Sequence, residues 1–265
     1  MKETGVTMNV DNVKELRTWF SEYCRSFHSS DPEFNRNIML EEEHALQVCE
    51  NSDRISVEES LDTDAMMLGQ VISLLHDIGR FEQYHQYKTF VDGVSVNHAE
   101  LGAMIIEETD VLAPLFPHER SIATKVIEMH NVFQVPEDLP QETKFFLRLL
   151  RDADKLHIWH FYIELFKRPE GIRSASWRLG LPDGSSCSPG IFERILNGEM
   201  VNRSQVKSLY DFKLMLLSWV YDLSFPASFR ILAERDYISG VCETLREDER
   251  AGEAVRLVRD FAGKN

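Results

Sequence analysis

Apolar side chains recur at helical spacing along most of the chain, and this feature constrains the fold more than any other. Segment 63–77 shows it best, with one apolar face formed by Met67, Val71, Leu74, Leu75 and Ile78. Gly79 follows where the C-terminal cap of this helix is expected. No persistent alternation of apolar and polar residues is present, so we do not expect a large sheet. The pattern predicts an all-α fold.

Several residues predict where helices begin and where they are interrupted. Asn97 can cap a helix that follows it, and Pro117 suits the first turn of another. Segment 141–166 is apolar nearly all round, as expected of a buried central helix. We expect irregular structure at 80–97 and at 168–190. With only 13 Gly and 9 Pro among 265 residues, there is room for long helices.

The charge balance limits the partners. Lys and Arg total 29 against 44 Asp and Glu, a formal charge of −15. Because such a surface repels nucleic-acid phosphates and anionic lipids, we expect neither nucleic acid nor membrane as a partner. There is no signal-peptide pattern and no apolar run of roughly 18–20 residues. The four cysteines are scattered without a C-x-x-C pair, which suits reduced thiols and predicts a cytoplasmic protein.

Metal-binding side chains recur on the apolar faces of separate predicted helices: His44, His76, Asp77, His98, His130 and Asp154. A lone histidine on such a face is more often a hydrogen-bonded core residue than a ligand. Together, however, these residues would bury several imidazoles and carboxylates, and each buried polar group without a partner costs several kcal/mol. Convergence on divalent metal ions would satisfy all of them at once.

The order His…His-Asp…His…His…Asp resembles the HD superfamily of metal-dependent phosphohydrolases. The motifs that carry the resemblance are Leu-Leu-His-Asp-Ile-Gly-Arg-Phe, Asn-His-Ala-Glu-Leu-Gly, Met-His-Asn and Asp-Ala-Asp-Lys-Leu. It implies an all-α, HD-domain helical bundle over residues 36–166. Residues 1–35 would form an N-terminal helical lead-in, and residues 167–265 a helical C-terminal extension packed on the same domain.

The same resemblance implies a ligand set for two metal ions. The first metal would be bound by His44, His76, Asp77 and Asp154. The second would be bound by His98 and His130, with Asp77 bridging the pair and serving catalysis.

Two other aspartates are expected to support these ligands. Asp152 competes with Asp154 for the last position, but residues two apart on a helix point about 160° away from each other. The family pattern places the ligand just before the lysine, which favours Asp154. Asp152 is then expected to orient a histidine, and Asp222 to hydrogen-bond one; the alternative for Asp222 is a buried cap.

The ligand types indicate which metals and which chemistry to expect. Nitrogen and oxygen ligands without a thiolate favour Mn²⁺, Fe²⁺ or Mg²⁺ and leave Zn²⁺ or Ni²⁺ open. Two such ions would hold a bridging hydroxide that attacks phosphorus in a small, nucleotide-like phosphomonoester or phosphodiester. Arg80 could donate hydrogen bonds to phosphoryl oxygens through its guanidinium fork. Family members bind substrate phosphate with the lysine that follows the last ligand, which corresponds to Lys155 here. The alternatives are a helix-end cation for Arg80 and a solvated or paired lysine for Lys155.

Two other functions are also compatible with the sequence. Some proteins of the HD fold bind two irons with these ligand types and activate O₂, so a di-iron oxygenase acting on a small organic substrate is the main alternative. A non-catalytic metal-binding regulator is the other, although the chain keeps every ligand of the pattern. The expected partner is a small anionic phosphorylated substrate. A homodimer is one of the oligomeric states that we consider.

Overall fold

The computed structural model describes residues 10–167, 180–184, 186–245 and 249–265, and these residues form helices and connecting loops without any strand. The predicted all-α class is therefore confirmed. The chain divides into two compact units, residues 1–153 and 154–265. None of the described helices combines the length and the hydropathy that a membrane span requires.

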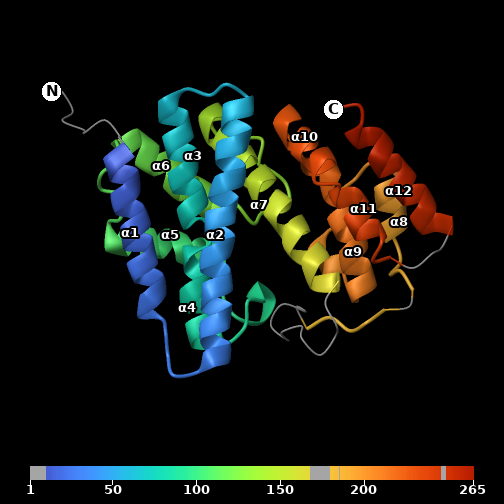
Figure 1. Cartoon of the computed structure of the whole chain (residues 1–265), viewed down its shortest axis with the longest axis horizontal. Helices are drawn as coiled ribbons and strands as arrows, with labels where there is room; N and C mark the ends of the chain where they lie inside the picture. The colour runs from blue at the N-terminus through green and yellow to red at the C-terminus, as the bar shows by residue number, and fades with distance from the viewer. Residues whose placement is uncertain (1–9, 168–179, 185, 246–248) are drawn as a thin grey trace. The chain divides into compact units, whose positions relative to one another are not determined.

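The first unit contains five of the six predicted metal ligands, on or beside the helices α2 to α6 (Figure 1), and the sixth, Asp154, belongs to the second unit. Its elements are α1 (Val10–Ser26), α2 (Pro32–Glu58), α3 (Thr63–Leu75), α4 (Ile78–Tyr87), the 3₁₀ turn η1 (Asp92–Val94), α5 (His98–Thr109), α6 (Pro117–Met129) and the first half of α7 (Gln141–Lys167). Helix α2 packs along α3, α4 packs against α5, and α6 packs against both α3 and α5. Helices that are distant in sequence are thereby brought around one interior.

Capping residues account for several of the helix starts. Asp62 accepts a hydrogen bond from the Ala65 amide at the start of α3. Asn97 accepts one from the Ala99 amide at the start of α5, and Pro117 is the first residue of α6. Each side chain or ring satisfies or removes an amide group that a helix start leaves unpaired. The two helix starts predicted at Asn97 and Pro117 are confirmed.

The interpretation of Gly79 as a helix cap is wrong. The prediction of irregular structure at the start of segment 80–97 is also wrong. The chain turns at Asp77 and begins a new helix, α4, at Ile78. Gly79 lies inside α4, where an added Cβ would overlap the carbonyl oxygen of His98 and lie 2.7 Å from the amide nitrogen of Gly102. Gly79 is therefore needed because α4 and α5 approach each other closely.

The second unit is also helical, as predicted for the C-terminal extension. It comprises the second half of α7, then α8 (Ile191–Leu196), η4 (Arg203–Gln205), α9 (Leu209–Ser218), η5 (Trp219–Asp222), α10 (Pro226–Glu234), α11 (Tyr237–Cys242) and α12 (Glu249–Ala262). Asp211 is fully buried and accepts hydrogen bonds from the Ser188 amide and hydroxyl, which ties the preceding loop to α9. The early part of the predicted loop at 168–190, residues 168–179, lies outside the described residues.

Candidate metal centre

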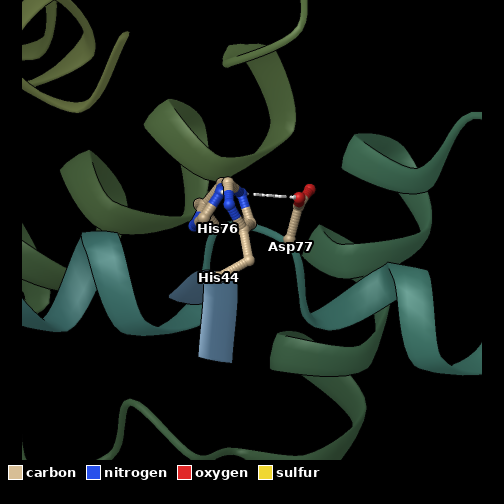
Figure 2. A group of neighbouring side chains, drawn as sticks. All are labelled: His44, His76 and Asp77. Atoms are coloured by element: carbon tan, nitrogen blue, oxygen red, sulfur yellow. Dashed lines mark hydrogen bonds and ion pairs between the residues drawn. The ribbon is translucent and has the colours of Figure 1, made fainter. Parts of the chain in front are cut away.

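One group of potential ligands forms where α2 passes the junction of α3 and α4. His44 comes from the middle of α2, His76 follows the last residue of α3, and Asp77 precedes α4. The Nε2 atoms of His44 and His76 are 3.2 Å apart, and they lie 3.4 and 3.5 Å from Oδ2 of Asp77. Figure 2 shows both imidazole rings beside this carboxylate. All three residues are buried, and their ligand atoms could hold one metal ion.

A second group shares Asp77 with the first. His98 is the first residue of α5, and His130 follows the last residue of α6. Their Nε2 atoms are 3.0 Å apart and lie 3.2 and 3.3 Å from Oδ1 of Asp77. Each carboxylate oxygen of Asp77 therefore faces a different pair of histidines. These three buried residues could also hold one metal ion.

The position of Asp77 in the chain would normally give its side chain another task. An aspartate that precedes a helix usually accepts hydrogen bonds from the first turn of that helix. The Asp77 side chain makes no such bond to α4, and its carboxylate is directed to the four histidines instead. The geometry thus favours the bridging position over local helix capping.

The outer nitrogens of three histidines define which ring atom faces the site. Nδ1 of His76 lies 2.8 Å from the Ser73 carbonyl, and Nδ1 of His130 lies 2.8 Å from the Ile127 carbonyl. Nδ1 of His98 lies 2.8 Å from the Asp92 carboxylate. Because these oxygens only accept hydrogen bonds, Nδ1 is the donor in each ring, and a neutral ring then carries its lone pair at Nε2.

These residues fit a divalent metal site. In neutral His98 and His130, two lone pairs face each other at 3.0 Å, an arrangement that requires a cation or a proton between them. Oδ1 of Asp77 is buried and makes no hydrogen bond, although both of these Nε2 atoms are near it. A donor set of imidazole nitrogens and a carboxylate suits Mn²⁺, Fe²⁺, Zn²⁺ or Ni²⁺. It suits Mg²⁺ less well, because Mg²⁺ is the hardest of the expected ions and prefers oxygen ligands.

Positive charge near Asp77 keeps its carboxylate ionised. Burial acts to raise the pKa of Asp77, but the charges of His76, Arg80 and His98 outweigh it and hold the pKa well below its usual range. Nε of Arg80 lies 3.5 Å from Oδ1 of Asp77. The Asp77 carboxylate is thus available as an anionic ligand.

The predicted residue Arg80 lies beside the centre and is anchored there. Its Nη1 donates to the Phe90 carbonyl at 2.7 Å and to the side-chain oxygen of Gln83 at 3.2 Å. The same nitrogen lies 3.5 Å from the Asp92 carboxylate. Arg80 therefore links α4 to the 90–92 segment as well as facing Asp77.

The remaining predicted residues lie in or near α7 and in the second unit. Asp152 is fully buried in the first unit, and Asp154, half-buried, begins the second. Nζ of Lys155 pairs with the Asp222 carboxylate at 2.7 Å, and both residues belong to the second unit. The lysine and aspartate singled out in sequence are thus each other's ion-pair partners. The roles of Asp154 as sixth ligand and of Asp152 and Asp222 as supports stay predictions.

Several residues around the centre were missed in the sequence. Asp92 contacts His98, Gln83 contacts Asp92, and Arg151 donates to the carbonyls of His130 and Phe133 at 3.1 and 3.2 Å. Glu41 is buried one turn before His44; burial first, and then the charge of Asp77, raise its pKa to about 7. The Asp-Gly pair at 92 has the pattern of a turn, which does not indicate a contact with a histidine. An Arg or Gln inside an apolar helix indicates a functional site only when its buried partners are known.

The family model described as the HD domain matches residues 42–159, which include every predicted metal ligand. No curated protein and no solved structure matches the chain. Because the matched segment also builds the buried histidine and aspartate cluster, residues 42–159 of this protein are an HD domain.

Proposed function

We propose that this protein is a metal-dependent phosphohydrolase that cleaves a small, nucleotide-like phosphomonoester or phosphodiester. The HD family generally consists of metal-dependent hydrolases. The observation that carries the proposal is the shared carboxylate, since each oxygen of Asp77 faces its own pair of histidine Nε2 atoms. A pair of adjacent three-ligand groups suits phosphoester chemistry, in which both the attacking and the leaving oxygen need stabilisation.

The side chains of the centre have distinct tasks in this proposal. His44, His76, His98 and His130 would hold the two cations through Nε2, and Asp77 would bridge them. When bound, two divalent cations supply Lewis-acid charge for the phosphoryl oxygens and a nucleophilic water at neutral pH. Because the ligands are buried, their charges act in a medium of lower dielectric than water and are correspondingly stronger.

Arg80 is the proposed phosphate-binding group of the first unit. Its guanidinium is adjacent to Asp77, so a phosphoryl group held at the centre would lie within its reach. The hydrogen bonds of Nη1 to Phe90 and Gln83 fix the direction of the fork, and a fixed cation stabilises developing charge without reorganising. A small anionic substrate needs such local positive charge, because the chain as a whole carries a formal charge of −15.

The other site roles rest on the family pattern. We propose that Asp154 completes the ligand set and that Lys155 contacts substrate phosphate, with Asp152 and Asp222 as supporting carboxylates. Lys155 is already paired with Asp222. That pair would hold the ammonium group in one position until an anionic substrate binds.

The experiment is a phosphate-release screen with a ligand variant as control. The protein would be purified, loaded with Mn²⁺, and incubated with nucleoside monophosphates, p-nitrophenyl phosphate and bis-p-nitrophenyl phosphate. We expect hydrolysis of at least one compound that is abolished in His76→Ala and retained in His118→Gln, since His118 is exposed and pairs with Glu142 on the surface. Stoichiometric metal without hydrolysis of any compound would contradict the proposal. Oxygen consumption by an iron-loaded sample would favour the di-iron oxygenase instead.

A further inference from the structure

His98 differs from His76 and His130 in the partner of its outer nitrogen. His76 and His130 each donate from Nδ1 to a carbonyl of the preceding helical turn. His98 donates from Nδ1 to a carboxylate, and both oxygens of Asp92 lie 2.8 Å away. His98 is therefore backed by a full negative charge that comes from a separate element, η1.

Asp92 is itself held by several donors. Gln83 is fully buried in α4, and the two hydrogens of its side-chain nitrogen are shared among three acceptors: Asp92 at 2.8 Å, the Ser95 hydroxyl at 3.0 Å and the Val96 carbonyl at 2.9 Å. The orientation of the Gln83 amide is set because its oxygen accepts from Arg80. Asn131 donates to the other oxygen of Asp92 at 3.3 Å. The carboxylate is therefore fixed from α4 and from the residue after His130.

We propose that Asp92 is a positioning residue that holds His98 with Nε2 directed to Asp77 and His130, and that it strengthens metal binding in this group. A carboxylate that accepts from Nδ1 fixes the tautomer and the ring orientation, and it makes Nε2 a better donor to a metal. The inference rests on the proposed metal centre and names a residue outside its ligand set.

His76 and His98, one from each ligand group, are therefore supported by different acceptors. The group of His44, His76 and Asp77 has a backbone carbonyl behind His76, whereas the group of Asp77, His98 and His130 has a carboxylate behind His98. A carbonyl dipole polarises an imidazole less than a charged carboxylate does. Removing the charge of Asp92 should therefore weaken the binding of the metal ion held by His98 and leave the affinity for the other ion nearly unchanged.

The test is a Mn²⁺ titration of the metal-free full-length protein, in which the electron paramagnetic resonance signal reports free Mn²⁺. Asp92→Asn keeps the shape of the side chain and removes its charge. Asp110→Asn is the matched control: it removes the same charge from an exposed position in the same unit, where asparagine suits the left-handed backbone. We expect two ions per chain in the control, and in Asp92→Asn one ion of unchanged affinity and one weakened by about 10- to 100-fold.

A second measurement reads the ring directly and does not depend on metal. Nitrogen-15 shifts of the imidazoles at alkaline pH should show His98 protonated at Nδ1 in the wild type and a mixture of tautomers in Asp92→Ala. Equal Mn²⁺ affinities in Asp92→Asn and Asp110→Asn would overturn the role of Asp92 and leave the metal centre standing. A wild-type protein that binds no Mn²⁺ would instead overturn the metal centre, and the proposed function with it.

Discussion

The Nε2 atoms of His98 and His130 lie 3.0 Å apart. Their Nδ1 atoms donate to the Asp92 carboxylate and to the Ile127 carbonyl, so in the neutral rings both Nε2 atoms are acceptors. Two acceptors at this distance repel each other unless a metal ion or a proton lies between them. A metal ion bound by both Nε2 atoms would remove this repulsion.

Removal of metal should destabilise the protein for this reason. A ligand that binds only the folded state and is present at a hundred times its Kd adds about 2.7 kcal/mol to the free energy of unfolding. We expect EDTA treatment to lower the melting temperature and Mn²⁺ to restore it, as measured by differential scanning calorimetry. An identical melting temperature with and without Mn²⁺ would contradict a metal site in the first unit.

Asp77 and His44 should differ in how many metal ions they control. Asp77 belongs to both ligand groups and His44 to only one. Asp77→Asn should therefore lower the occupancy of both ions, and His44→Gln the occupancy of one, as measured by mass spectrometry of bound metal after gel filtration. His118→Gln provides the control because His118 is exposed and pairs with Glu142. Equal losses in the Asp77 and His44 variants would contradict a bridging Asp77.

Gly79 should tolerate no side chain. Its Cβ would overlap the His98 carbonyl, so Gly79→Ala must push α5 away from α4 and displace His98. Overpacking of this kind costs about 1–3 kcal/mol. Gly93→Ala is the matched control, because nothing lies within 4 Å of its added Cβ, and it should change the free energy of unfolding by about 0.5 kcal/mol or less. Urea denaturation would measure both; equal effects would contradict the close helix contact.

Arg151 should be required to hold the loop that follows His130 in its folded conformation. Its buried guanidinium donates to the carbonyls of His130, Val132 and Phe133. Arg151→Met would leave these carbonyls without that donor, and each buried acceptor left without a partner costs about 1–3 kcal/mol. We expect a loss of stability in urea together with weaker Mn²⁺ binding. Arg148→Met, on the same helix and exposed, should have little effect on either quantity.

The ion pair of Lys155 with Asp222 should show strong energetic coupling. Both side chains are largely buried, with 8% and 19% of their surface exposed. Breaking such a pair from one side costs about 3–5 kcal/mol, because the remaining charge is left without its partner. The double variant Lys155→Met/Asp222→Asn should therefore destabilise the protein by less than the sum of its two single variants. Additive effects in a double-mutant cycle would contradict the pair.

Helical spacing and capping residues are local properties, and they predicted the fold class well. The helices beginning after Asn97 and at Pro117 depend on residues within one turn of the cap. The error at Gly79 has a non-local cause. A glycine after an apolar helix has the pattern of a cap, but its real contact is the backbone of α5, about twenty residues further along the chain.

The sequence by itself determined the helical class and the order of histidines and aspartates that marks an HD domain, because both follow from residue type and spacing. Only the tertiary structure decided which oxygen of Asp77 faces which histidines, that Asp92 stands behind His98, and that Lys155 pairs with Asp222. These contacts join residues from different elements, often far apart in the chain. Their geometry depends on how the helices pack, and no local pattern in the sequence records it.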